Sequence, residues 1–171
     1  MLEIVFFFVF GELFDNVDEF AERVTKRGDG YVYRYGTAER PVASATVTLR
    51  YRKPDGSLGE RRFTTWRTHH GPIVATKNGR WIAEALMWKP VPALEQSWLR
   101  TKTSDLKSFL QVASRRANSS NDTLFADSKG EIAFLMPQFM PLRDNRFDYT
   151  RPVDGSDPAT ASIGFTKGKA A

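Results

Sequence analysis

Apolar and polar residues alternate with a period of two along several short stretches of the chain. Four stretches rich in β-branched and aromatic residues follow this pattern, at 31–35, 45–51, 61–68 and 81–87. Such alternation predicts half-buried strands, because successive side chains of a strand point to opposite faces. Lys-Pro-Asp-Gly at 53–56 and Asn-Gly at 78–79 favour tight reversals. We therefore expect neighbouring strands to pair as antiparallel hairpins.

A further hairpin is predicted in the last third of the chain. Apolar runs at 123–126 and 131–135 flank Asp127-Ser128-Lys129-Gly130, whose aspartate and glycine suit a turn. Beyond this hairpin the alternation stops, and prolines remove backbone donors at 137, 141, 152 and 158. We expect ordered loop there rather than sheet. Residues 159–171 have no periodicity and are expected to be disordered or poorly packed.

Two helices are predicted between these strand regions. The first runs from Pro92 to Arg100, and the second runs from Asp105 to Arg116 with Ser104 as its N-cap. In the second helix, one face packed on the sheet is predicted by the spacing of Leu106, Phe109, Leu110 and Ala113. The whole pattern predicts an α+β fold, a mainly antiparallel β-sheet with about two helices packed on it.

The chain opens with an unbroken apolar run, Ile4–Phe10. This run is too short to span a bilayer, which takes about 20 apolar residues in a helix. It also lacks the basic start and the small-residue cleavage site of a signal peptide. We expect a buried strand, and a start of artificial or misassigned origin is the alternative.

Charge and composition narrow the function classes. The 25 basic and 20 acidic residues give a net charge of +5, which suits a polyanion partner. The basic residues are scattered, however. Arg50 and Arg52 alternate along a predicted strand, as expected for its solvated face. Arg115 and Arg116 end a predicted helix, where the helix dipole favours positive charge. We expect neither a nucleic-acid nor a membrane partner. Cysteine is absent, which excludes disulfides and thiolate chemistry and leaves the compartment open.

Two groups of residues are candidates for chemistry. Asp15 and Asp18, with the carbonyl of Val17 between them, can present oxygens to Ca²⁺, which takes six to eight; helix N-capping by Asp15 is the structural alternative. His69 and His70 are the two histidines. Neighbours in a strand point to opposite faces, which argues against joint metal ligation. A histidine base is conceivable, but no G-x-S-x-G motif supplies a serine.

Three blocks of sequence, in order, match motifs of one known family. Phe14–Glu22 resembles D-x-V-D-x-F-x-E, and Trp66–Val74 resembles R-T-x-H-G-P-V-V. Residues 121–132, followed by Pro-Leu-Arg-Asp at 141–144 and Asp-Gly at 154–155, resemble N-N-x-x-Y-A-D-x-x-G-N-I and its proline- and glycine-rich loop. In these blocks the chain resembles β-subunits of the penicillin acylase family, which also covers acyl-homoserine-lactone acylases. Asp122 and Glu131 stand where the family usually has asparagine.

The resemblance implies an N-terminal-nucleophile hydrolase with an αββα-type fold. It divides the chain into an apolar lead at 1–14, a β-subunit segment at 15–158 and a tail at 159–171. It also implies that calcium is held by Asp15, Val17 and Asp18, in an incomplete site. Intact members of the family are periplasmic or secreted.

Family enzymes use a β-subunit N-terminal serine whose α-amine serves as base. Leu2 follows Met1 here, and Ser119 and Ser120 have no free amine beside them, so we assign no catalytic residue. The resemblance implies a fragment of an acylase that hydrolyses a linear amide of the penicillin or acyl-homoserine-lactone type, inactive alone.

Its partners would be the remaining acylase segments or an α-subunit, and the intact enzyme would take a small acyl-amide. A fragment without its partner segments would leave sheet edges unpaired, and such edges favour self-association. A stand-alone β-rich binding module without catalysis is the alternative. A third hypothesis, a nucleic-acid binder, rests on the net charge alone.

Overall fold

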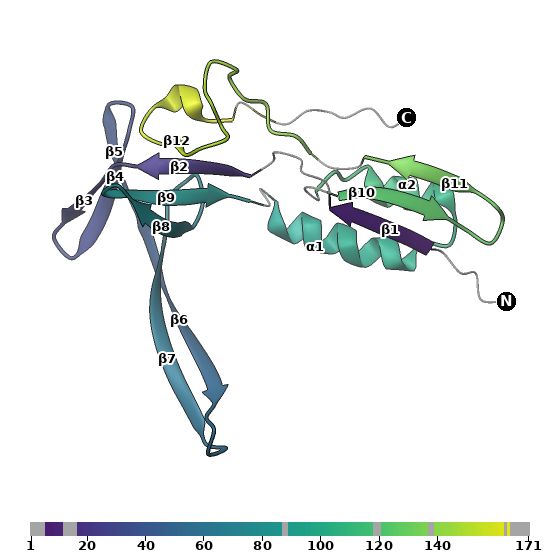
Figure 1. Ribbon diagram of the computed structural model, residues 1–171, viewed down its shortest axis with the longest axis horizontal. Coiled ribbons are helices and arrows are strands. Elements are labelled where there is room, and N and C mark those ends of the chain that lie inside the picture. Colours follow the sequence, from purple (N-terminus) through teal and green to yellow (C-terminus); the bar gives the residue numbers. More distant parts are fainter. Residues whose placement is uncertain are drawn as a thin grey trace. The chain divides into compact units, whose positions relative to one another are not determined.

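The chain forms two compact units in a computed structural model that describes residues 6–11, 17–86, 89–117, 121–136, 139–162 and 164. Unit 1 comprises Met1–Val17, Leu86–Arg143 and Ser162–Ala171, and unit 2 comprises Asp18–Ala85 and Asp144–Ala161. Antiparallel strands predominate, with two α-helices (Figure 1). This confirms the predicted fold class. The division at 1–14, 15–158 and 159–171 stays a prediction.

Unit 2 is built around a four-stranded sheet in the order β12-β2-β9-β8. The bounds of its strands are β12 Val153–Asp154, β2 Asp18–Glu22, β9 Arg80–Ala85 and β8 Ile73–Lys77. Strand β2 runs antiparallel to β9, so that Phe20 pairs with Ala83 and both are fully buried. The turn at Asn78-Gly79 is confirmed, with positive φ at both residues. The alternative role for Asp15 was to cap a helix that follows it. The strand at 18–22 excludes that helix.

The rest of unit 2 consists of one more small sheet and one long hairpin. The sheet is antiparallel, with strands β3 Val24–Arg27, β4 Gly30–Tyr35 and β5 Ala38–Pro41. The hairpin joins β6 Ala43–Arg52 to β7 Leu58–Arg67. Its turn places Gly56 at φ 82°, as the sequence predicts. The strands predicted at 31–35, 45–51 and 61–68 are therefore confirmed.

Unit 1 packs a helix against a three-stranded antiparallel sheet. The sheet order is β1-β10-β11, with bounds β1 Phe6–Gly11, β10 Asn121–Ala126 and β11 Ile132–Leu135. The helical elements are α1 Pro90–Leu99, the 3-10 turn Arg100–Lys102 and α2 Leu106–Ala113. Buried Phe109 of α2 meets Phe125 of β10 with ring centroids 4.9 Å apart, and Leu135 completes this core. The predicted hairpin and the packed helix are both confirmed.

Two details of unit 1 and one of unit 2 differ from prediction. Asp105, not Ser104, caps α2: its carboxylate accepts the backbone N–H of Ser108 at 2.7 Å, and a carboxylate suits the positive end of a helix. Leu110 is exposed, so the apolar face of α2 is narrower than predicted.

The other difference lies in the proline-rich region and the tail. Strand β12 lies where only loop was expected, and Thr160, just inside the predicted tail, is 1% exposed. Strand β1 confirms that the apolar lead is extended, whereas the burial of its side chains, Ile4 and residues 165–171 lie outside the described residues. Of the helices in the described ranges, none has the length and apolar character needed to cross a bilayer.

Candidate functional site

The corner after β7 places the paired histidines. Strand β7 ends at Arg67, and the backbone N–H of Thr68 donates to the carbonyl of Gly71 at 3.0 Å. A Cβ on Gly71 would lie 1.9 Å from the backbone oxygen of Glu84 in β9. Only glycine fits there, because the backbone on both sides cannot yield. The Gly71 contact therefore fixes the corner against β9 and sets the position of His70.

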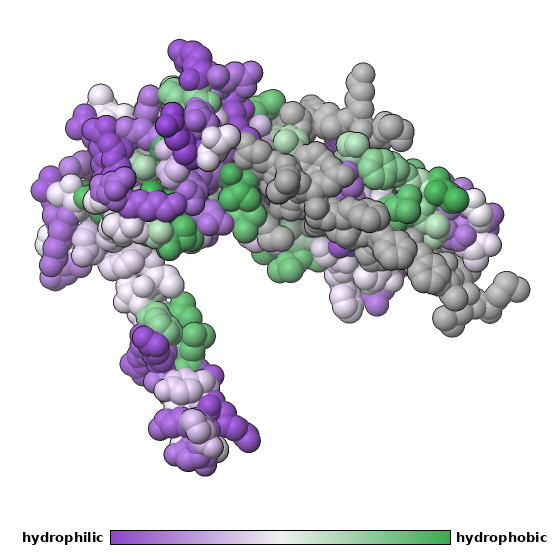
Figure 2. Space-filling model, in the orientation of Figure 1, coloured by the Kyte–Doolittle hydropathy of each residue, from purple (hydrophilic) through white to green (hydrophobic). Residues whose placement is uncertain are grey.

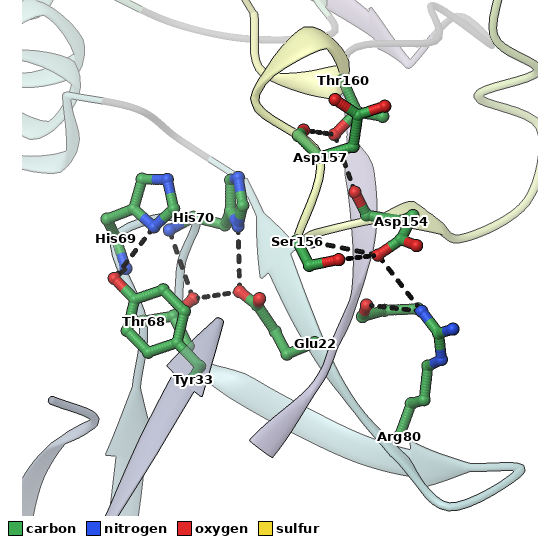
Figure 3. A network of polar contacts seen from close by, with 11 residues as sticks. Glu22, Tyr33, Thr68, His69, His70, Arg80, Asp154, Ser156, Asp157 and Thr160 are labelled. Atoms are coloured by element: carbon green, nitrogen blue, oxygen red, sulfur yellow. Dashed lines mark hydrogen bonds and ion pairs between the residues drawn. The ribbon is translucent and has the colours of Figure 1, made fainter. Parts of the chain in front are cut away.

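A buried carboxylate holds this corner from the other side (Figure 3). Glu22 of β2 is fully buried, and its Oε1 accepts from the Thr68 hydroxyl at 2.6 Å and lies 2.9 Å from Nδ1 of His70. The tautomer with a proton on Nδ1 lets the His70 ring donate to this oxygen. Gly155 makes room for Glu22, since a Cβ there would lie 2.7 Å from Oε2.

Ring contacts as well as hydrogen bonds hold His70. Its imidazole stacks on Phe20 with centroids 3.9 Å apart and an interplanar angle of 4°. The residue is 6% exposed, and its buried Nε2 has no hydrogen-bond partner within the part of the chain that the structure describes. Buried polar atoms normally have one. Oε2 of Glu22 is also buried without a hydrogen-bond partner among the described residues, so the corner contains two such atoms.

His69 lies beside it on the solvent side. Nδ1 of His69 is 3.0 Å from the hydroxyl of Tyr33, and Tyr35 meets the ring edge-on at 4.4 Å. Arg40 lies over Tyr35, 4.1 Å from the ring centroid. Although part of His69 is open to water, these rings remove water from its imidazole, and this desolvation, with the charges of His70 and Arg40, lowers its pKa from 6.5 to about 4.

The two imidazoles lie side by side, with centroids 3.8 Å apart and an interplanar angle of 39°. The sequence argument that their side chains point to opposite faces was therefore wrong. It assumed a strand, whereas both residues lie in a bend after β7. Sequence reasoning also missed Glu22 and Tyr33 as partners, because their contacts join positions far apart in the chain.

A second polar cluster fastens β12 to the sheet. Asp154 accepts from Arg23 at 2.8 Å, pairs with Arg80 at 3.2 Å and accepts from the Ser156 hydroxyl at 2.7 Å. Burial alone would raise the pKa of Asp154, but the hydrogen bonds from Ser156 and Arg23 and the charge of Arg80 outweigh it and lower the pKa to about 2. This cluster is an anchor for the loop that carries Gly155.

Only two of the three residues predicted to hold calcium are among the described residues. Asp18 is fully buried and pairs in register with Ala85, and Val17 is partly exposed. Asp15, like Ser119 and Ser120, lies outside the described residues. In the described ranges, no three His, Asp or Glu residues gather in a way that could hold a metal ion. The calcium site stays a prediction.

The hydroxyls in the corner network belong to buried residues and have partners within the network. Thr68 is 4% exposed and donates to Glu22, and Tyr33 is 3% exposed and contacts His69. A hydroxyl that attacks an amide must reach it. The network therefore orders the corner, and its open side presents His69.

Comparisons with known proteins agree on one family. A family profile described as penicillin amidase matches residues 13–170. A curated penicillin G acylase from Escherichia coli is 29% identical over 147 residues, covering 83% of this chain and 16% of that protein. The solved structure of a thermostable penicillin G acylase from Alcaligenes faecalis aligns with a TM-score of 0.72 and 26% identity, covering 95% of this chain and 29% of that one.

Proposed function

Because the chain belongs to the penicillin amidase family, we propose that it is a portion of an acylase that hydrolyses a linear amide bond. The match of residues 13–170 to the family carries this proposal, and the shared fold supports it. The chain spans 16% of the curated relative and 29% of the solved one. The remaining acylase segments, or an α-subunit, are then its partners.

The substrate that fits best is a small acyl-amide. Both relatives are penicillin G acylases, which favours a penicillin-type amide, and acyl-homoserine lactones are the second class to test. The pocket that selects the acyl group would involve residues beyond this chain. We therefore place the chain in the framework of the enzyme rather than at its nucleophile.

These 171 residues are inactive alone in this proposal. The hydroxyls of Thr68 and Tyr33 are buried and engaged, which supports it. The test is hydrolysis of a chromogenic acyl-amide by the purified chain. We expect no turnover above the blank; turnover that scales with chain concentration and survives repeated purification would contradict it.

Calcium binding belongs to the same proposal. The buried carboxylate of Asp18, the carbonyl of Val17 and the carboxylate of Asp15 are hard oxygen donors of the kind Ca²⁺ prefers. A cation there would neutralise a carboxylate that is fully buried. The test is the melting temperature with and without CaCl₂: a rise that Asp15→Asn removes supports the site, and an unchanged melting temperature contradicts it.

A second candidate function, a stand-alone binding module, rests on the β6–β7 hairpin. Paired residues share a face, so one face carries Val47, Leu49, Tyr51 and Phe63, each between 37% and 51% exposed, together with Arg61, whose guanidinium lies 4.9 Å from the Phe63 ring centroid. Figure 2 shows this hydrophobic colour on the projecting hairpin. The opposite face is charged, with Glu60 pairing to Arg50 and Arg62. An apolar face left open is a docking surface, for acylase segments or for another copy of the chain.

A further inference from the structure

The β6–β7 hairpin is the part of unit 2 with the least support from its neighbours. Each strand has ten residues, and within the described residues the two strands form a sheet of their own. Every residue of β6 is exposed, and Figure 1 shows the hairpin extending away from the other strands of unit 2. A two-stranded hairpin is marginally stable in water unless another element packs on it. An element that covers its apolar face would therefore stabilise it.

Two ring contacts shape this apolar face. The ring of Tyr51 lies over Gly59, its partner across the hairpin, where an added Cβ would lie 2.7 Å from the ring carbon Cζ. The guanidinium of Arg61 lies over the ring of Phe63. Tyrosine and arginine are among the residue types that most often dominate the binding energy of protein interfaces. Their place beside exposed aliphatic side chains favours a protein segment as the partner.

Most of the net charge of the protein lies on the same hairpin. Residues 43–67 contain six basic and two acidic residues, which accounts for four of the five units of net positive charge. Glu60 pairs with two arginines on the opposite face, and Asp55 accepts from the Ser57 hydroxyl at 2.7 Å. On the apolar face, Arg61 has no ion pair among the described residues. A segment with carboxylates and few cations complements this face.

We propose, on the basis of the framework role, that this face docks an apolar segment with carboxylate side chains, supplied by the part of the acylase outside this chain. The chain covers 29% of the solved relative, so most of an intact acylase is available as the partner. A carboxylate of that segment pairs with Arg61, and its apolar side chains cover Val47 and Leu49.

Other occupants complement the face less well. A second copy of the chain would bring together two hairpins with the same excess of positive charge, and this repulsion weakens self-association at low salt. A single-stranded nucleic acid stacks its bases on rings and pairs its phosphates with a groove of cations, whereas Val47 and Leu49 occupy the middle of this face. An anionic bilayer meets the same charge, and the family match favours a protein segment over it.

The test is the binding of overlapping synthetic peptides that cover the Alcaligenes faecalis penicillin G acylase outside its aligned segment. Binding to the 171-residue protein would be measured by fluorescence anisotropy. We expect the peptides that bind to be apolar and acidic, and their affinity to fall as the salt concentration rises. Arg61→Glu should weaken the best peptide at least about tenfold. A peptide with lysine in place of its acidic residues should bind this variant and not the parent.

Arg52→Glu is the matched control, because it makes the same change of net charge on the opposite face of the hairpin. It should change peptide affinity much less than Arg61→Glu does, with the circular dichroism spectra of both variants unchanged. The proposal is overturned if no peptide binds at millimolar concentration or if the two variants bind alike. Tighter binding of phosphatidylglycerol vesicles, oligothymidine or a second copy than of every peptide would also overturn it. Hydrolysis of an acyl-amide by the purified chain would contradict the framework role and leave these binding results in place.

Discussion

At the scale of single residues, packing and hydrogen bonds fix the conformation of the corner after β7. Gly71 is needed because β9 passes against its Cα, and Gly155 because the carboxylate of Glu22 does. His70 then fills the space between Glu22 and Phe20. Sequence inspection singled out the histidines and the acidic Asp15–Glu22 segment, but it could not pair His70 with Glu22. That pairing depends on strand register, which alternation alone leaves open.

Gly71→Ala should destabilise unit 2 strongly. The added Cβ would lie 1.9 Å from a backbone oxygen, and backbone cannot rotate away as a side chain can. We expect a loss of about 1–3 kcal/mol or more in the free energy of unfolding, measured by urea denaturation. The matched control is Gly30→Ala, where the nearest atom is 3.9 Å from the added Cβ. Equal effects of the two substitutions would contradict this account of the corner.

Asp154 should make unit 2 sensitive to acid. Its pKa is lowered from 3.8 to about 2 in the folded state, so its ion pairs contribute fully above pH 3.8 and are lost as the pH falls through about 2. The side chain is 34% exposed, and solvent screening makes the contribution modest. In urea unfolding between pH 5 and pH 2, Asp154→Asn should show a shallower fall in stability than the parent. Parallel curves for the two proteins would disprove the role of Asp154.

At the scale of elements, alternation located the strands that are long or strongly patterned. The stretches at 31–35, 45–51 and 61–68 and the hairpin at 123–135 were predictable because β-branched and aromatic residues recur there with period two. The short strands β3 and β5 were not, since four residues give too little pattern. Strand β12 was not predicted, because two residues between prolines are too few to show a pattern. It is a strand because it pairs with β2.

The β6–β7 hairpin should drive self-association of the isolated chain through its apolar face. Leu49→Thr with Phe63→Thr keeps strand propensity and removes apolar area, and burying each such side chain contributes about 1.5–3 kcal/mol. We expect at least about tenfold weaker association in sedimentation velocity across a concentration series. Thr46→Ser with Thr64→Ser, a facing pair on the other side, is the control. A parent chain that stays monomeric at high concentration would refute the prediction.

At the scale of the whole molecule, the family was predictable from three ordered sequence blocks, and the profile match over residues 13–170 confirms it. The fold class followed from the same patterns. The matched relatives are several times longer than this chain. The acyl group therefore cannot be specified from these residues, and the proposed framework role rests on the family match and the coverage together.

The framework role is tested most directly in a whole acylase. Residues 13–170 would replace the aligned segment of the Alcaligenes faecalis penicillin G acylase, and hydrolysis of penicillin G would be measured for the chimera and for the isolated chain. Gel filtration and circular dichroism would show that both proteins are folded. We predict hydrolysis by the chimera and none by the isolated chain. A folded, assembled chimera without activity, or hydrolysis by the isolated chain, would contradict the account.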